Sequence, residues 1–453
     1  MSQPSLLRQL GLFSATAIVV SNMIGTGVFT MTGFIASNLG SPAWVVGVWF
    51  IGAVLALAGA LCYSELSINF PRSGGEYVYL SESFGPVWGF LTGWVSFFAG
   101  FSAPIAAGAL AIVEYLGFFS ARLAPQAGAP SSLGLLIACL IVAVFTVLNV
   151  VGLLHVARLQ NVLTSIKVVV ILAFIVLGFA AGRGDWAHFS LSAAPASPRS
   201  LPISILLSLV LVYFSYSGWN AATYVAEEIR EPRRTLPRAL LLGTLLVALV
   251  YGALNLVFLY ALPLTSIQGV VRVGAQAAQA LFGPTVAGAF SGLMAFSLLS
   301  TVNAMTIIGP RVYYAMAGDG AFFRIARRVH PRFHTPWIAV LAQGLCGCLM
   351  IVFGTFRSLV GYVGFTLWLF TMMAVIGLFR LRRRPGWQQL PSVNFLFPLI
   401  PAIYVAASAW ALINAVLYQP KESAWGLLTI ILGGALYYVG SRESSVTKNR
   451  MIT

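Results

Sequence analysis

Charged side chains are scarce in this 453-residue chain. Asp, Glu, Lys and Arg make up 8% of it, against about 25% in soluble domains, and 59% of the residues are hydrophobic. This composition excludes a soluble globular protein of this length. Acidic residues are the rarest, 11 against 26 Lys and Arg, so the formal net charge is +15. Such a surplus of cations is typical of nucleic-acid binding or of a membrane protein, and the placement of the cations decides between them.

Cysteine and histidine are also scarce, with four residues of each. The cysteines lie in apolar segments, where we expect small buried hydrophobic side chains rather than a metal site. They are Cys62, Cys139, Cys346 and Cys348. Neither His155 nor His188 lies near a Ser or Cys with an acid at catalytic spacing, and the sequence has no P-loop. The sequence therefore predicts neither an enzyme nor a bound metal ion or cofactor.

Long apolar stretches dominate the chain. A membrane-spanning helix needs about 20 predominantly apolar residues, and twelve stretches meet that requirement. They are residues 10–37, 43–68, 86–116, 133–152, 160–181, 201–228, 236–262, 284–310, 337–354, 359–379, 395–417 and 424–440. No change of composition marks a soluble domain, so we expect an all-α membrane protein with twelve transmembrane helices in one domain, residues 1–453.

The spans sort the cationic residues onto two sides. Twelve spans place both termini on one side, which receives 19 Lys and Arg residues, among them Arg311, against six on the other side. The side richer in Lys and Arg is the cytoplasmic one. We therefore expect a multi-pass plasma-membrane protein with cytoplasmic termini and no nucleic-acid partner. The first span is too long for the apolar region of a signal peptide, so no cleavage is expected.

Two spans are interrupted at mid-membrane depth. The first contains Gly-Thr-Gly at residues 25–27, and the sixth contains Tyr-Phe-Ser-Tyr-Ser-Gly-Trp-Asn at residues 213–220. The alternative explanation of each segment is that its small residues allow close packing of an unbroken helix. Spans one and six begin successive groups of five, however, and paired breaks of this kind are typical of inverted-repeat transporters with a midplane site. This predicts one repeat in residues 10–182, a second in 201–381, and two additional helices in 393–440.

The breaks expose backbone groups of opposite polarity. Free amides at the start of a half-helix favour a carboxylate, and free carbonyls at the end of the preceding one favour an ammonium group. The amides are those of Gly25, Thr26 and Gly27, and the carbonyls are those of Ile24, Phe214 and Ser217. Together they predict a receptor for an α-amino acid zwitterion. Asn22 and Asn220 would add polar contacts beside Gly218, and Phe214 and Trp219 would close over the solute, with core or lipid-facing packing as their alternative.

Lys167 lies inside the fifth span. An ionisable group there usually faces the bundle interior and is functional, and the alternative is that it snorkels to the interface. In the interior its ammonium would replace a sodium ion or shuttle a proton. The acids Glu65, Glu227 and Glu228 lie near helix ends and predict ion pairs. Since no acid falls within the expected pocket, a dibasic substrate is disfavoured, although carbonyls and aromatic faces also bind cations.

Six segments in order give the chain a family resemblance. They are residues 22–29 (NMIGTGVF), 71–80 (PRSGGEYVYL), 214–220 (FSYSGWN), 227–237 (EEIREPRRTLP), 309–317 (GPRVYYAMA) and the connector from His330-Pro331 to Thr335-Pro336. On these segments the chain resembles the amino acid-polyamine-organocation superfamily, and within it the L-amino acid transporter family and its bacterial relatives. The likeness extends over nearly the whole chain.

The resemblance implies a LeuT-like fold with a 5+5 inverted repeat, broken helices 1 and 6, and alternating access. It implies that the Thr26 and Gly27 amides hold the substrate carboxylate, that the carbonyls named above hold the amine, and that Phe214 gates the site from outside. Lys167 matches a family lysine that stands in place of a sodium site. Asn220 matches a polar family residue on which substrate affinity depends. Ser217 stands where many relatives have glycine, which would narrow the pocket.

Together these points predict sodium-independent transport of neutral L-amino acids across a bacterial inner membrane, by exchange. The alternatives are proton-coupled uptake with Lys167 titrating, transport of polyamines or other organic amines, and a sensor that binds without transport. A sensor is disfavoured because residues 441–453 form only a short tail. Animal members of the family pair with a heavy subunit through a cysteine after span three. Residues 120–132 contain none, so no disulfide-linked heavy subunit is expected.

Overall fold

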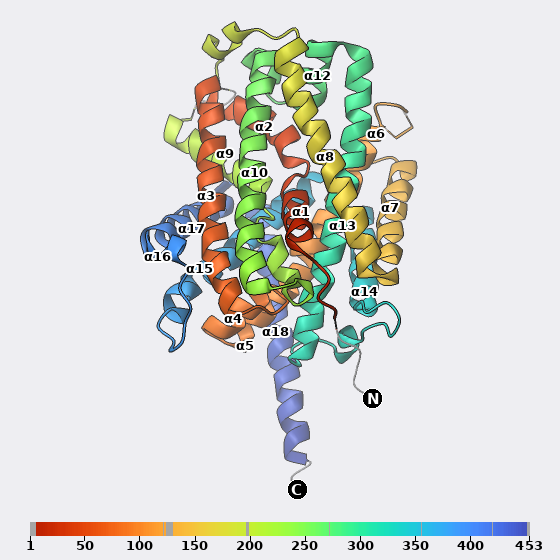
Figure 1. Ribbon diagram of the computed structural model, residues 1–453, viewed down its shortest axis with the longest axis vertical. Coiled ribbons are helices and arrows are strands. Elements are labelled where there is room, and N and C mark those ends of the chain that lie inside the picture. Colours follow the sequence, from red (N-terminus) through yellow and green to blue (C-terminus); the bar gives the residue numbers. More distant parts are fainter. Residues whose placement is uncertain are drawn as a thin grey trace.

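The protein is a bundle of helices (Figure 1). A computed structural model describes residues 6–120, 122–123, 130–195, 199–270, 272–354, 356–418 and 420–450. The first half of the described chain contains α1 (Leu12–Met23), α2 (Gly27–Leu39), α3 (Pro42–Asn69), α4 (Glu76–Phe84), α5 (Pro86–Val95), the π-helical turn η1 (Ser96–Ser102), α6 (Ala103–Leu116), α7 (Ser132–Val151), α8 (Leu153–Ala181), η2 (Trp186–Ser190) and α9 (Leu201–Tyr216). The second half contains η3 (Ala221–Glu228), α10 (Pro232–Ala261), α11 (Leu264–Ile267), α12 (Val273–Phe282), α13 (Pro284–Gly318), η4 (Arg324–Arg327), α14 (Trp337–Phe353), α15 (Phe356–Leu381), α16 (Pro391–Asn394), α17 (Leu399–Tyr418) and α18 (Pro420–Arg450).

Many of these helices are suited to a bilayer. Among the described residues, nine are long and apolar enough to span a membrane, and three further apolar helices are shorter. The shorter ones are Trp337–Phe353, Trp368–Leu381 and Ser423–Val439. Each of them overlaps a predicted span. The fold is therefore an all-helical, multi-pass arrangement, and the full count of twelve spans stays a prediction.

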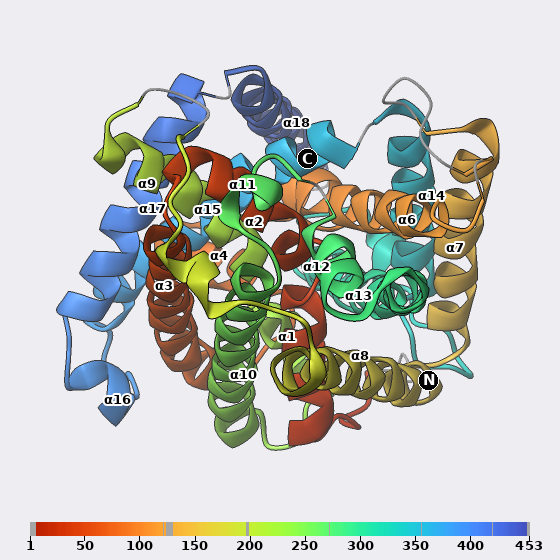
Figure 2. The ribbon, with the colours of Figure 1, turned by 90° about the horizontal axis from the view of Figure 1, so that it is seen from above.

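The broken first span lies inside the bundle. Seen from above, α2 lies near the centre, α16 and α17 lie at one edge, and α7 lies at the opposite edge (Figure 2). Helix α10 packs along α3 and α1, while α13 packs against α6 and α8. The first described residues and the end of α18 lie on the same side of the bundle (Figure 1). The interrupted backbone is thus surrounded by protein. In a membrane, the polar groups of a broken helix can be satisfied only in such surroundings.

The chain breaks at both predicted positions, and the two breaks touch each other. Helix α1 ends at Met23 and α2 begins at Gly27, while α9 ends at Tyr216 and η3 begins at Ala221. A Cβ atom on Gly27 would lie 2.6 Å from the Ser215 Oγ atom and 2.8 Å from the Ser215 Cα atom, so only glycine allows this approach. Gly218 has φ +100°, and a Cβ atom there would lie 2.9 Å from the Asn22 carbonyl carbon.

The third span differs from the uniform helix expected over residues 86–116. Between α5 and α6 the chain forms the π-helical turn η1, which places Gly100 and Phe101 beside the breaks. Wide turns of this kind occur frequently at functional sites. This turn was not predicted, because apolar residues continue the helical pattern through it, and Gly100 and Pro104 are residue types that are frequent in membrane helices.

Buried ion pairs hold helix ends together. Glu65 pairs with Arg382 at 2.6 Å, and Glu228 pairs with Arg311 at 2.8 Å. These contacts confirm the expected ion pairs of Glu65 and Glu228, whereas Glu227 accepts a hydrogen bond from the Ser73 amide at 3.4 Å. The predicted span ends at residue 310, just before Arg311, but α13 continues through Arg311, whose side chain is 1% exposed. A guanidinium can be buried there because a carboxylate meets it.

Candidate functional site

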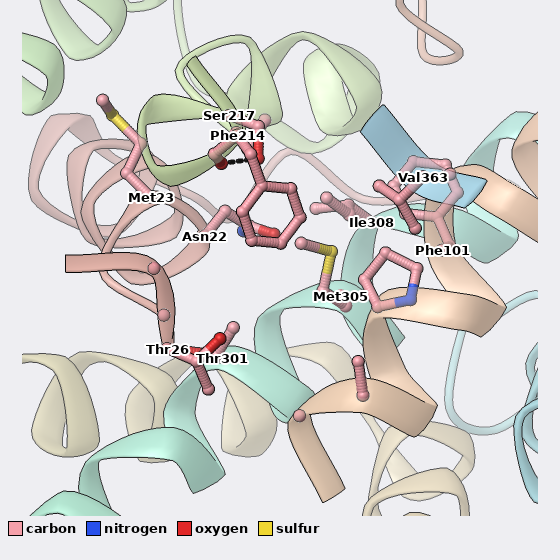
Figure 3. A pocket seen from close by; sticks show the side chains of 18 of the residues that line it. Asn22, Met23, Thr26, Phe101, Phe214, Ser217, Thr301, Met305, Ile308 and Val363 are labelled. Carbon is pink, nitrogen blue, oxygen red and sulfur yellow. Dashed lines mark hydrogen bonds between the residues drawn. The ribbon is translucent and has the colours of Figure 1, made fainter. Parts of the chain in front are cut away.

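A cavity lies where the two breaks meet. It encloses about 820 Å³ of empty space, including its open mouth, and both breaks, η1, α6 and α13 line it. Figure 3 shows Asn22, Thr26, Phe214 and Ser217 arranged around it, with Met305 opposite. Of the ten predicted substrate-binding residues, eight line this cavity. They are Asn22, Gly25, Thr26, Gly27, Phe214, Ser217, Gly218 and Asn220.

The remaining two predicted residues lie elsewhere. The Trp219 indole is 2% exposed and packs edge to face on Tyr63, with ring centroids 4.7 Å apart. A Cβ atom on Gly59 would lie 2.7 Å from that indole, so Trp219 fills the core against α3 rather than closing over a solute. Ile24 is 1% exposed and is not among the described residues that line the cavity. Core packing, the alternative explanation for Trp219, is thus what the structure shows.

Backbone donors gather at the start of α2. Thr26 is the residue before the first turn, and its side chain makes no capping hydrogen bond. Within the described chain, the Thr26 and Gly27 amides have no backbone partner, whereas the Gly25 amide donates to the Met23 carbonyl at 2.9 Å. The helix dipole of α2 adds partial positive charge at the same place. Thr26 and Gly27 therefore offer an anion site, and Gly25 contributes space rather than a donor.

Two of the three predicted backbone acceptors are already used inside the protein. The Ile24 carbonyl accepts hydrogen bonds from Lys167 Nζ at 2.6 Å and from Thr301 Oγ1 at 3.1 Å. The Phe214 carbonyl accepts from the Ser217 amide at 3.1 Å and the Ser217 hydroxyl at 2.7 Å. A carbonyl oxygen has two lone pairs, so the Phe214 carbonyl is saturated. The Thr301 hydroxyl has one proton and lies 3.1 Å from both the Ile24 and the Ser21 carbonyls, so it does not donate fully to either. The Ser217 carbonyl alone receives no hydrogen bond within the described chain.

Lys167 faces the bundle interior. Its side chain is 1% exposed, and Nζ donates to the Ile24 carbonyl and to Thr301 Oγ1 at 2.9 Å. Snorkelling is therefore excluded. The side-chain nitrogen thus links the end of α1 to α13 beside the first break.

The apolar part of the cavity lies opposite the backbone groups. The Phe214 ring extends over Asn22, and Met305, Ile308, Val363 and Phe101 complete that wall (Figure 3). A cavity with an apolar wall and a few oriented polar groups is the usual form of a small-molecule site. Phe214 is only partly buried, which suits a side chain at the edge of such a site.

One acidic residue beside this cavity was not predicted from the sequence. Glu76, the first residue of α4, is 4% exposed and accepts a hydrogen bond from the Asn220 side chain. Its backbone follows Gly74 (φ +120°) and Gly75 (φ +54°), and a Cβ atom on Gly75 would lie 2.6 Å from the Tyr224 ring. Burial raises the pKa of the Glu76 carboxyl above its ordinary value. The Gly-Gly-Glu sequence was the available signal, but it lies far from both breaks in the chain.

Comparisons with known proteins agree with this geometry. Residues 10–438 match the family described as "Amino acid permease". The human "Large neutral amino acids transporter small subunit 2" is 29% identical over 443 residues, covering 96% of this chain and 81% of the relative. "Serine/threonine exchanger SteT" of Bacillus subtilis (strain 168) is 29% identical over 439 residues, covering 96% and 97%. The mouse "Asc-type amino acid transporter 1" is 29% identical over 446 residues, covering 96% and 82%.

Proposed function

Because the chain belongs to the amino acid permease family, we propose that it transports neutral L-amino acids across a membrane by exchange. The relatives are transporters and exchangers by name, and the chain covers nearly the full length of the bacterial exchanger. The apolar cavity wall, with no acidic residue among the described lining residues, suits a neutral side chain. Among neutral amino acids we expect small or medium ones, such as the serine and threonine that the name of the bacterial exchanger indicates.

One observation carries this proposal: within the described chain, the residues that line the cavity include free backbone donors and a free backbone acceptor. The unpartnered amides of Thr26 and Gly27 would hold the substrate carboxylate, and the Ser217 carbonyl would accept from its ammonium. A zwitterion satisfies both sets at once, whereas a simple amine leaves the amides unpaired. This asymmetry favours amino acids over polyamines.

The charge of Lys167 supports independence from sodium. Its ammonium lies between α1 and α13 and donates to the Ile24 carbonyl at 2.6 Å. Backbone carbonyls and hydroxyls are the ligands that a sodium ion would require, and here they already surround a fixed cation. A second cation would meet direct repulsion. We propose that Lys167 replaces the coupling ion.

The proposal includes a topology. Twelve spans would be arranged as two five-helix repeats, 10–182 and 201–381, followed by 393–440, with cytoplasmic termini in a bacterial inner membrane. The inverted arrangement would let the cavity open alternately to each side in the LeuT-like manner, and Phe214 would close it from outside. The segment after the third span, residues 120–132, lies partly outside the described residues. Its lack of cysteine supports transport without a disulfide-linked heavy subunit.

Proteoliposomes test the function directly. Vesicles that contain the purified chain are loaded with unlabelled L-serine, and uptake of external radiolabelled L-serine is measured in sodium-free buffer. We expect fast uptake that requires internal L-serine and that does not change when sodium is added. Protein-free vesicles give the background.

Other outcomes would favour the rival functions. Uptake into empty vesicles driven by an inward pH gradient would favour proton coupling through Lys167. Uptake of radiolabelled putrescine, which has no carboxylate, would favour amine transport and contradict the role of the Thr26 and Gly27 amides. Saturable binding of L-serine without uptake would indicate a sensor. A panel of unlabelled amino acids competing with L-serine would then define the preferred side chain.

A further inference from the structure

Two cysteines meet where α7 packs against α14. Cys139 lies in α7 and Cys348 lies in α14, and both are free thiols. The Cys139 Sγ atom lies 3.9 Å from the Cys348 carbonyl oxygen, and the Cys348 Sγ atom lies 3.8 Å from the Cys139 carbonyl oxygen. Each sulfur therefore contacts the backbone of the other cysteine. Contacts between a thiol and a carbonyl are weak, so they do not hold the two thiols apart.

A glycine lets the two helices approach each other closely. A Cβ atom on Gly344 would lie 2.2 Å from the Thr146 Oγ1 atom and 3.0 Å from the Thr146 Cβ atom. Small residues of this kind allow the backbones of membrane helices to come together. Cys348 lies four residues after Gly344, and Cys139 lies seven residues before Thr146, so the cysteines share the helix faces that form this contact. A disulfide requires Cα atoms less than about 7 Å apart, and a contact spaced by glycine favours such a separation.

The cysteine pair is accessible from outside the bundle. Cys139 and Cys348 are partly exposed, whereas Cys62 and Cys346 are buried. The pair thus departs from the expectation that all four cysteines are buried. Helix α7 lies at the edge of the bundle (Figure 2), and Leu140, next to Cys139, is 60% exposed. Exposed apolar side chains of a membrane-spanning helix face lipid, so an apolar reagent dissolved in the bilayer can reach the pair.

The pair also lies away from the cavity at the two breaks. Among the described residues that line this cavity, none belongs to α7 or α14. Helix α7 packs mainly against α14 and α6. A covalent bond between α7 and α14 would therefore leave the groups that line the cavity in place.

We propose that Cys139 and Cys348 are a site of oxidative modification, at which an apolar organic disulfide converts the two thiols into a disulfide bond between α7 and α14. The bond would close a loop that spans 209 positions of the chain. A cross-link between residues so far apart restricts the unfolded chain strongly, which stabilises the folded protein. The modification leaves the cavity open. It is independent of the identity of the transported solute.

The reaction is a double thiol–disulfide exchange. One cysteine, as its thiolate, attacks a sulfur atom of the reagent, whose S–S bond breaks and releases one thiol. The thiolate of the other cysteine then attacks the protein sulfur of this mixed disulfide and releases the second thiol. The protein loses two hydrogen atoms and two electrons, and the reagent gains both.

Dipyridyl disulfide tests the proposal, because each exchange step releases one coloured pyridinethione. The folded protein is treated in proteoliposomes, the released thione is measured by absorbance, and the intact protein is weighed by mass spectrometry. We expect two thiones per wild-type chain, with no pyridyl group retained and a mass lower by two hydrogen atoms. Dithiothreitol should restore the original mass. Peptide mapping should find Cys139 joined to Cys348.

Single substitutions provide the controls. Cys139→Ala and Cys348→Ala should each release one thione and retain one pyridyl group, because no second thiol completes the exchange. Cys346→Ala should behave as the wild type, since residue 346 lies two positions from residue 348 and so about 200° around α14. Cys139→Ser takes the place of Cys139→Ala if the alanine variant does not fold.

Stability and exchange provide further readouts. Oxidation should raise the thermal unfolding midpoint of the wild type, whereas the same treatment should leave the midpoint of Cys139→Ala unchanged. The rate of L-serine exchange and its KM should be equal before and after oxidation of the wild type.

Several results would overturn the proposal. Two retained pyridyl groups on the wild type would mean that the thiols are accessible but not adjacent, and no thione release would mean that they are not accessible. A disulfide that still forms in Cys348→Ala would show that another cysteine is the partner. A loss of L-serine exchange that dithiothreitol reverses would contradict the open cavity. If the untreated wild type exchanges no L-serine, the proposed function fails, while the thione yield and the intact mass still decide whether the disulfide forms.

Discussion

Two glycines of the first break should respond to alanine in opposite ways. At Gly27 the new methyl carbon would lie 2.6 Å from Ser215 Oγ and 2.8 Å from the Ser215 Cα atom. The second contact is with backbone, so no side-chain rotation relieves it. Overpacking of this kind costs about 1–3 kcal/mol. At Gly25 the nearest atom is Thr301 Cγ2 at 3.9 Å, and φ is not positive. Alanine at this position restricts the unfolded chain, which should raise the free energy of unfolding by about 0.4–1 kcal/mol.

The two variants are measured together. We expect a lower thermal unfolding midpoint of the purified protein for Gly27→Ala, and an equal or higher midpoint for Gly25→Ala. In exchange assays Gly25→Ala should nevertheless raise the KM for L-serine, because its methyl group projects into the cavity beside the Thr26 amide. If Gly25→Ala lowers the midpoint as much as Gly27→Ala, or leaves the KM unchanged, the assigned geometry of the break is wrong.

Three further predictions concern Lys167, the Thr26 amide and the buried ion pair of Arg311 with Glu228. Lys167→Ala should lower exchange about tenfold or more, through loss of a charge-assisted hydrogen bond to the first break, while expression stays close to normal; near-normal flux would contradict its role. Thr26→Pro should abolish L-serine binding in a radioligand assay because the ring removes an amide donor, and retained affinity would refute the carboxylate assignment. Arg311→Met should lower the unfolding free energy by about 3–5 kcal/mol by leaving Glu228 buried and unpaired. Adding Glu228→Leu should restore most of that loss, and a double variant no more stable than the single one would count against the pair.

The backbone breaks were predictable because their cause is local. Gly-Thr-Gly at residues 25–27 and Ser217-Gly218 interrupt apolar stretches, and helices cannot be broken in lipid without a surrounding site. In the structure both helix breaks lie at the positions predicted from these residues. The expected interior position of Lys167 followed from the cost of a charge in the membrane. These predictions needed only composition and position along the chain.

Other features depend on partners from distant segments. Whether Trp219 faces the cavity or the core is decided by Tyr63 and Gly59 on α3, which no local pattern reveals. The Ile24 carbonyl was expected to be free, yet it accepts a hydrogen bond from Lys167 Nζ at 2.6 Å. Glu76 reaches Asn220 from a different helix. Side-chain direction and hydrogen-bond saturation are properties of the packed bundle, so the sequence indicates candidate groups but not which of them stay available.

The π-helical turn η1 contains one residue more than a regular α-helical turn would have in the third span. Each residue turns an α-helix by about 100°, so a deletion inside a regular span rotates everything beyond it onto another face. In residues 86–116 the deletion can instead remove the extra residue of the turn and convert it to a regular α-helix. The helices on either side of the turn would then keep the faces that they present to their neighbours. A one-residue deletion should therefore be survivable in this span, at the expense of the wall formed by Gly100 and Phe101, whereas the same deletion in α10 would displace an entire buried face.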